Sequence, residues 1–359
     1  MDSVEFFAHL EAIKNGDIAV QEEAANAIVA LNDPQYLPQI QYHINDPDPL
    51  IRRVMLWTLR NYAGSFAYAP LLPYLSDPDM AVREAALVLF MEGGTDAAAA
   101  LVDATLAADQ ATQFAAVQAL GQFRTPEAIQ PLMRAAESSN PDIREVAVLS
   151  LGVYPDPEII SALFRALQDE PQIRIAGLEG LKNRELSAEE KNTVAACLND
   201  EHPEIRAAAV RVLGSATPAS AALDAESFVR RAAAEFLTDA NLLARLCADP
   251  DSSVRTAAAE SIGRQNLGLE DILLPMLSDS VPGVRRAAVT ALGNSDRPDV
   301  IPALVRCLQD PKPGIRAAAA TVLGKIGGDE VIAALEEAAK SGNPILRGII
   351  QNALNTARK

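Results

Sequence analysis

Apolar residues along this chain of 359 residues recur with helical spacing. Residues 77–90 show the pattern with the sequence DPDMAVREAALVLF, in which an acidic turn precedes apolar positions three or four residues apart. Such spacing places apolar side chains on one face of a helix. A single arginine, Arg83, stands at the start of this helix. The pattern predicts an all-helical protein, and the low content of aromatic residues, 4%, is consistent with it.

The same phrase returns many times. It reads DPDPLIRRVMLWTL at 46–59, DPDSSVRTAAAESIG at 249–263 and DPKPGIRAAAATVLG at 310–324. When the copies are aligned, one arginine recurs about every thirty residues, and glutamine takes its place twice. These anchor positions are Gln21, Arg52, Arg83, Gln113, Arg144, Arg174, Arg206, Arg230, Arg255, Arg285, Arg316 and Arg347. Twelve units therefore fill the chain.

Each unit is interpreted as two helices. The second helix begins at the acidic turn, where an acid caps exposed N–H groups and proline suits the first turn. The first helix, as in 300–310, carries its own apolar stripe. One pair cannot bury both faces, so the units must stack, which predicts an all-α, right-handed α-solenoid of about twelve helical hairpins. We expect a glycine cap at the end of several second helices: Gly121, Gly152, Gly214, Gly263, Gly293 and Gly324.

The motif of a capped turn followed by Val/Ile-Arg-x-Ala-Ala-x-x-Ala-Leu-Gly resembles the HEAT repeat. It is most similar to the short form of the repeat found in bilin-lyase-like (PBS-lyase-like) proteins. The resemblance extends over essentially the whole chain and implies the solenoid fold. HEAT-like arrays serve as scaffolds, adaptors, bilin lyases, hydroxylases and DNA glycosylases, so the motif alone does not select a function.

The recurring arginine has two interpretations. In a stack, it can pair with the acids of its own turn or of the adjacent turn, forming a ladder that fixes the register of the repeats. Alternatively, a row of arginines could bind anions. We favour the structural ladder, because acids recur four and six residues before several of these arginines, as Asp77 and Asp79 do before Arg83.

Charge and segment composition exclude several classes of partner. The net charge of −17 argues against nucleic acid, since phosphate binding needs clustered Lys and Arg. The first residues lack the basic and apolar regions of a signal peptide, and no apolar run reaches the length of a membrane span. The odd number of three cysteines is expected of reduced thiols. We expect a cytoplasmic protein with no nucleic-acid or membrane partner.

Candidate chemistry is sparse. HEAT-like hydroxylases bind iron through paired His-Glu dipeptides, and this sequence contains no His-Glu. Cys197, Cys247 and Cys307 all lie on first helices, and Cys197 and Cys307 are four units apart, too far to share a metal. We interpret them as core or surface thiols, with a bilin ligand as the alternative. No catalytic residue, cofactor or metal site is assigned.

The helical period also predicts which residues face the concave groove of the solenoid. The fifth residue after each anchor points away from the buried face, and the first residue after it flanks that direction. These positions are apolar in five successive N-terminal units and polar afterwards. An apolar stripe on an exposed face indicates an interaction site, with Trp57 as a natural anchor. The alternative is that curvature buries these side chains against one another. The nine predicted groove residues are Arg53, Trp57, Glu84, Val88, Phe114, Gln118, Glu145, Leu149 and Ile175.

Two consecutive units near Arg230 are short by about six residues each. We therefore expect N-terminal repeats at 1–213, irregular short repeats at 214–254 and C-terminal repeats at 255–359. The short repeats form either a hinge or a local bend.

The predicted function is a non-catalytic scaffold, adaptor or assembly factor that binds a partner protein or a helical peptide in the N-terminal groove. The alternative is a bilin-lyase-like subunit handling a tetrapyrrole, with Arg53, Glu84 and Glu145 facing its propionates and ring nitrogens.

Overall fold

The computed structural model describes the chain except for residues 1, 108, 296, 342–343 and 359. Its described residues form helices joined by turns, and they contain no strand. The helices make twelve pairs, as the sequence predicts, and the pairs separate into two compact units, 1–181 and 182–359.

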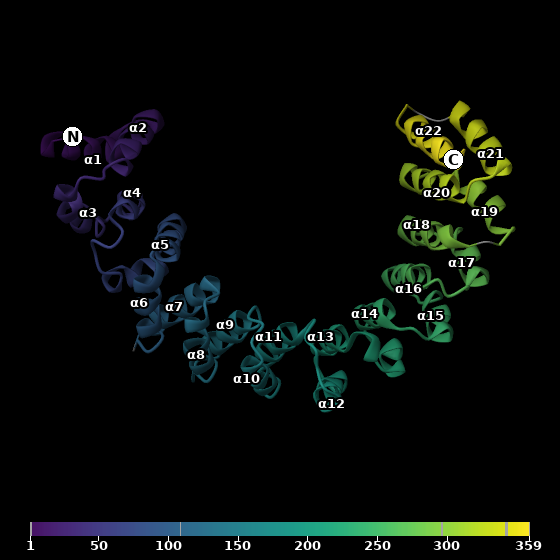
Figure 1. Ribbon diagram of the computed structural model, residues 1–359, viewed down its shortest axis with the longest axis horizontal. Helices are drawn as coiled ribbons and strands as arrows, with labels where there is room; N and C mark the ends of the chain where they lie inside the picture. The colour runs from purple at the N-terminus through teal and green to yellow at the C-terminus, as the bar shows by residue number, and fades with distance from the viewer. Residues whose placement is uncertain (1, 108, 296, 342–343, 359) are drawn as a thin grey trace. The chain divides into compact units, whose positions relative to one another are not determined.

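Unit 1 contains six helical pairs. Its first helices are α1 (Ser3–Asn15), α3 (Leu37–His43) after a 3-10 turn η1 (Pro34–Tyr36), η3 (Ala69–Ser76), α6 (Gly94–Ala104), α8 (Pro126–Ala135) and α10 (Glu158–Ala166). Its second helices are α2 (Ile18–Val29), α4 (Pro49–Leu59) with η2 (Arg60–Tyr62), α5 (Met80–Glu92), α7 (Gln110–Phe123), α9 (Pro141–Leu151) and α11 (Pro171–Leu181). Each second helix contacts the next, and within this unit they line its concave side (Figure 1).

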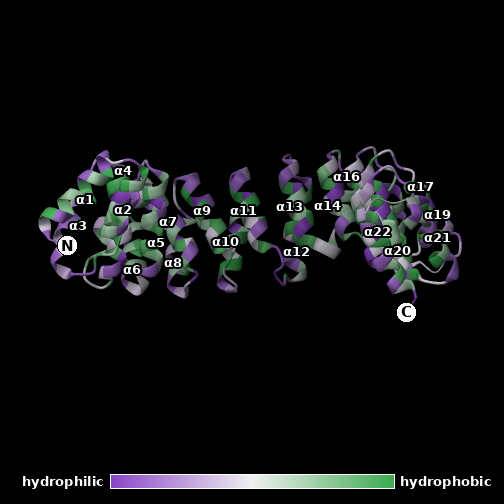
Figure 2. Ribbon diagram, turned by 90° about the horizontal axis from the view of Figure 1, so that it is seen from above, coloured by the Kyte–Doolittle hydropathy of each residue, from purple (hydrophilic) through white to green (hydrophobic). Residues whose placement is uncertain are grey.

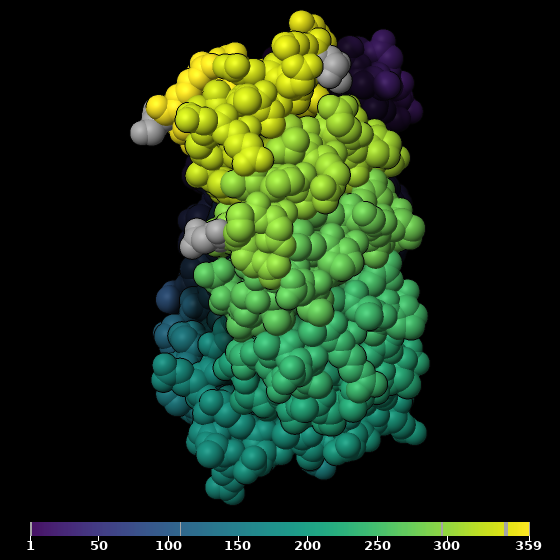
Figure 3. Space-filling view, turned by 90° about the vertical axis from the view of Figure 1, so that its right-hand side faces the viewer, coloured from purple at the N-terminus to yellow at the C-terminus, as the bar shows by residue number. Residues whose placement is uncertain are grey.

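Unit 2 repeats the arrangement. Its first helices are α12 (Ala188–Ala196) with η4 (Cys197–Asn199), η6 (Ala219–Leu223), α15 (Ala240–Leu246), α17 (Glu270–Met276), α19 (Val300–Cys307) and α21 (Asp329–Ser341). Its second helices are α13 (Pro203–Leu213) with η5 (Gly214–Ala216), α14 (Ser227–Phe236), α16 (Ser252–Gln265), α18 (Pro282–Ala291) with η7 (Leu292–Asn294), α20 (Pro313–Ile326) and α22 (Pro344–Ala357). Figure 3 shows successive repeats of this unit as adjoining layers.

The core of each unit lies between its two layers of helices. In α5, Val82, Ala86 and Phe90 are completely buried, and they stand one before, three after and seven after the anchor Arg83. The equivalent positions are buried in α18 and the adjoining η7, where Val284, Ala288 and Leu292 follow the same spacing. Figure 2 shows the resulting alternation of hydrophobic and hydrophilic residues along the helices. The helical period therefore predicted the core correctly.

Two acids of the acidic turn have different roles: one binds the arginine of the preceding repeat, and the other caps the second helix. The first acid, Asp77, accepts hydrogen bonds from Arg52 of the preceding repeat, at 2.8 Å from both Nε and Nη2. The third residue, Asp79, caps α5 by accepting from the backbone N–H groups of Ala81 and Val82. The ladder is confirmed, and its carboxylates come from the next repeat. The turn of the arginine's own repeat supplies backbone carbonyl oxygens instead, as Asp77 does to Arg83.

Most of the glycines expected as helix caps lie within helical segments, and several of them lie where neighbouring second helices come close together. Gly121, Gly263 and Gly324 lie inside α7, α16 and α20, and Gly293 lies in η7, so the expected caps are wrong there. A Cβ atom on Gly263 would stand 2.5 Å from the Cα atom of Ala291 in the next second helix. Gly121, Gly263 and Gly324 are needed because neighbouring second helices approach too closely there for a side chain. Two glycines do follow a second helix directly: Gly152 and Gly214.

Two first helices are reduced to 3-10 turns. In η3, Pro73 removes an N–H group and blocks regular α-helical bonding. In the short repeat of unit 2, η6 alone replaces the first helix, in agreement with the short spacing of the units near Arg230. The proposed hinge at 214–254, and the boundaries at 213 and 254, stay predictions.

Among the described residues, no single helix is long and apolar enough to cross a bilayer. Only α5 and α6 together reach that length, across a bend of 120°. In this pair Leu89, Phe90 and Leu101 are buried, whereas Met80 and Met91 are exposed.

Candidate partner-binding surface

Five apolar residues on successive second helices of unit 1 form what we call the inner-face row. They are Trp57 on α4, Val88 on α5, Phe114 on α7, Leu149 on α9 and Ile175 on α11. Leu149 is 46% exposed, and the other four are half-buried. Each keeps part of its surface open, so mutual burial does not fully cover the row. The structure places these predicted residues on adjacent helices of one face; their role in binding stays a prediction.

Trp57 has a defined environment at the N-terminal end of this row. The guanidinium carbon of Arg60 lies 4.7 Å from the centre of its ring, in a cation–π contact. Arg60 is itself paired with Glu92 of α5, and this hydrogen bond raises the pKa of the arginine. The ion pair thus connects η2, which directly follows α4, with α5 and restrains the indole at the surface. This suits an anchor residue, because little conformational freedom remains to be lost on binding.

The polar residues predicted for the groove flank this row. Glu84 and Gln118 are exposed, whereas Arg53 and Glu145 are half-buried. Glu84 and Gln118 line a cleft of about 130 Å³ between α5 and α7, which Arg83 also lines. We call it the α5–α7 cleft. The structure therefore brings two of the predicted groove residues together.

The equivalent positions in unit 2 point outward too, but their chemistry differs. Glu235, Glu260, Thr290 and Thr321 are all exposed on their second helices. The period thus identifies the outward direction in both units. Of the residues compared, only those of unit 1 present an apolar row, so the two units differ in the partners that their exposed faces could bind.

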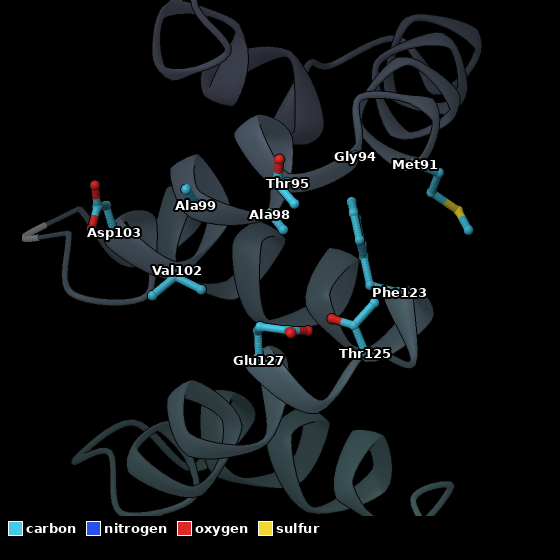
Figure 4. Close-up of a pocket in the computed structure, with 10 residues that line it drawn as sticks. All are labelled: Met91, Gly94, Thr95, Ala98, Ala99, Val102, Asp103, Phe123, Thr125 and Glu127. Carbon is cyan, nitrogen blue, oxygen red and sulfur yellow. The ribbon is translucent and has the colours of Figure 1, made fainter.

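The sequence did not predict a larger recess, which has a volume of about 630 Å³. It is lined by α6 together with the ends of α5 and α7 and the start of α8, and none of the nine predicted residues lines it. Figure 4 shows the ring of Phe123 pointing toward Gly94. The recess depends on the direct junction of α5 with α6, where Gly94 has a φ of 60°. The only sequence signal for it is the pair Gly93-Gly94.

The cysteines show little sign of reactivity. Burial raises the pKa of Cys247 to about 12 and also raises the pKa of Cys307, so both thiols are held in the protonated form. Cys197 is less deeply buried, at the end of the first helix of its repeat. Within the part of the chain that the structure describes, no three His, Cys, Asp or Glu residues are grouped to hold a metal.

Because its helical pairs stack as successive repeats, the protein is an α-solenoid repeat protein. A family model described as HEAT repeats matches residues 8–89, 98–182 and 269–355, which is more than half of the chain. The chain therefore belongs to the HEAT-repeat family. Two further models match shorter stretches: one described as HEAT repeat at 240–264, and one described as HEAT repeat associated with sister chromatid cohesion at 191–213. No curated protein sequence matches the chain.

Solved structures show the same fold at low sequence identity. A chain from a structure describing Kap95p binding to RanGDP is 13% identical, with a TM-score of 0.64 over 98% of this chain and 60% of that one. Importin beta is 15% identical, with a TM-score of 0.60 over 98% of this chain and 55% of its own. Kap121p bound to the extreme C-terminus of the protein phosphatase Cdc14p is 15% identical, with a TM-score of 0.54 over 98% and 49%. The chain thus spans about half to three fifths of the length of these HEAT solenoids.

Proposed function

We propose that this protein is a non-catalytic scaffold or adaptor that binds a partner protein or a helical peptide on the inner face of unit 1. The observation that carries the proposal is the row of five partly exposed apolar side chains on adjacent helices. Soluble proteins seldom leave such a contiguous stripe open to water unless it binds something. A cytoplasmic location is part of the same proposal and rests on the sequence.

The composition of the row favours a peptide or protein as its ligand. Trp57 and Phe114 offer large rings with few rotatable bonds, and aromatic residues of this kind dominate the binding energy of many protein interfaces. Glu84, Gln118 and Glu145 stand beside the row as a polar rim. Apolar centres with polar rims are typical of interfaces that bind an amphipathic helix.

The fold supports this assignment at a coarser level. HEAT solenoids of similar architecture are described with Ran, with Nup1 and with the C-terminus of Cdc14p. Ran, Nup1 and Cdc14p are partners of those proteins and are not assigned to this chain. Their relevance here is that proteins with this fold are found in complexes with other proteins, including the terminus of a chain.

Selection from a random peptide library displayed on phage tests the proposal. The full chain is expected to enrich peptides with apolar residues at helical spacing, and Trp57→Ala with Phe114→Ala should weaken their binding by about tenfold or more. The matched control, Thr290→Ala with Thr321→Ala, changes the equivalent positions of unit 2 and should leave binding unchanged. Equal weakening by both pairs of changes would contradict the proposal. A shift of a bilin's visible absorption on mixing with the chain, lost in the Trp57 and Phe114 variant, would favour the tetrapyrrole alternative instead.

A further inference from the structure

The ladder arginines use the two halves of their guanidinium group differently. Nη1 donates to carbonyl oxygens of the turn before its own helix, and Nε with Nη2 donates to both oxygens of an aspartate in the next repeat. Among the described residues, the pairs that show this fork include six with donor–acceptor distances of 2.7 to 3.1 Å: Arg52–Asp77, Arg144–Asp169, Arg206–Asp224, Arg230–Asp249, Arg255–Asp279 and Arg285–Asp310.

Arg83 keeps only the first half of this arrangement. Its Nη1 atom donates to the carbonyl oxygens of Asp77, at 2.6 Å, and Pro78, at 3.0 Å. Within the described ranges of the chain, its Nε and Nη2 atoms have no hydrogen-bond acceptor. The fork that binds a carboxylate in the six pairs named above is therefore open at Arg83.

The fork of Arg83 is open because the turn of the next repeat lacks the ladder aspartate. Asp109 caps α7 through the N–H groups of Ala111 and Thr112, as Asp79 caps α5. Counting back two residues from each cap gives Asp77 in one turn and Ala107 in the other. Ala107 thus stands where the ladder requires an aspartate, and its methyl group cannot accept a hydrogen bond.

The open fork lies beside the surface proposed for partner binding. Arg83 lines the α5–α7 cleft together with Met80, Leu87, Glu84 and Gln118. Met80 is 64% exposed, so the approach to the cleft is apolar. An arginine fork binds a carboxylate through two parallel hydrogen bonds, a geometry that lysine cannot reproduce. Glu84 opposes a free anion by charge repulsion, which favours a carboxylate delivered by a chain that also makes apolar contacts.

We propose that Arg83 binds an aspartate or glutamate side chain of the protein partner, which completes the ladder in trans at the position of Ala107. This inference rests on the proposed function, because it names the chemistry that the partner presents at the α5–α7 cleft. The predicted ligand is an acidic side chain of the partner. It lies close to those apolar residues of the partner that contact the inner-face row.

Nuclear magnetic resonance of the arginine side chains tests the fork directly. Acetate should shift the Nε–Hε signal of Arg83 in a saturable manner, whereas acetamide, which has no charge, should leave it unchanged. Arg83→Lys removes this signal and so assigns it. Ala107→Asp should supply the missing carboxylate from within the chain, raise the melting temperature and abolish the response to acetate. An unshifted signal, or an equal shift in Ala107→Asp, would overturn the proposal.

The peptide selection separates this proposal from the function on which it rests. Peptides enriched by the unaltered chain should carry an acid, and the acid should lose its enrichment on Ala107→Asp and on Arg83→Lys while the apolar residues keep theirs. The loss of affinity for an acidic peptide should be about tenfold or more, as expected for a charge-assisted pair. Acid enrichment that persists in both variants would overturn the carboxylate site and leave the inner-face row intact. If Trp57→Ala alone abolishes the enrichment of apolar peptide residues, that result supports the inner-face row as the peptide-binding surface, independently of the carboxylate site.

Discussion

Arg285 on α18 holds Asp310 of the following repeat through a two-point hydrogen bond, with Nε–Oδ2 at 2.7 Å and Nη2–Oδ1 at 3.1 Å. Its Nη1 atom also donates to the carbonyl oxygen of Asp279, at 2.8 Å. The arginine therefore joins the turn of its own repeat to that of the next. Since only 11% of the arginine side chain and 8% of the aspartate side chain are exposed, water cannot readily replace either partner.

Replacing this arginine should destabilise unit 2. Arg285→Ala leaves Asp310 charged and largely enclosed without its guanidinium, and we expect a loss of about 2–4 kcal/mol in the free energy of unfolding. Denaturant unfolding followed by circular dichroism measures it. The control is Arg297→Ala, whose ion pairs with Asp271 and Asp299 are exposed to water and should contribute far less than the ladder pair. Equal effects of the two changes would show that the ladder has no special structural role.

The ladder also predicts how stability depends on pH. Hydrogen bonds from Arg230, Arg255 and Arg285 lower the pKa of Asp249, Asp279 and Asp310 below the ordinary value of 3.8. A carboxyl group with a lowered pKa in the folded state adds stability above its unfolded pKa and loses it as pH falls through the folded value.

The melting temperature should therefore change little between pH 7 and pH 5 on account of these groups and should fall below about pH 4. Asp310→Asn should lower the melting temperature at pH 7 and make the decline in acid shallower. A decline of equal depth in Asp310→Asn and in the unaltered chain would mean that this rung is not part of the acid response.

Close packing of second helices makes a separate prediction. Gly263→Ala places a methyl group against Ala291 of the neighbouring helix, and we expect a loss of about 1–3 kcal/mol because the helices must move apart. Gly314→Ala, in the first turn of α20, meets no atom within 4 Å and should be neutral or stabilising by up to about 1 kcal/mol. Thermal unfolding of both variants checks the opposite signs. Equal stability of the two variants would contradict the assigned role of Gly263.

The helical period accounts for most of what could be predicted from the sequence. It correctly placed Val82, Ala86 and Phe90 in the core, because burial of one helix face depends only on spacing along that helix. It also placed Trp57 and Leu149 outside the core. The resemblance to HEAT repeats was confirmed for the same reason, since its motif encodes the local pattern.

Features that depend on the distance between repeats were harder to predict. Glycines near the ends of second helices are typical of caps, and only the approach of the next helix shows why Gly263 is required. The sequence revealed Gln113 in place of an arginine, but the open fork at Arg83 follows only once the partner is known to lie in the next turn. The recess beside α6 depends on the angle at which α5 meets α6, which composition does not encode.

The fluorescence of Trp57 tests the central claim most directly, because it is the only tryptophan of the chain and belongs to the inner-face row. In the free protein, acrylamide should quench its emission, since the indole is partly exposed. A peptide from the library selection should protect it from quenching in a saturable manner, and Phe114→Ala should raise the peptide concentration required. Emission that stays equally quenchable at saturating peptide would show that the peptide binds elsewhere and would contradict the inner face of unit 1 as the binding surface.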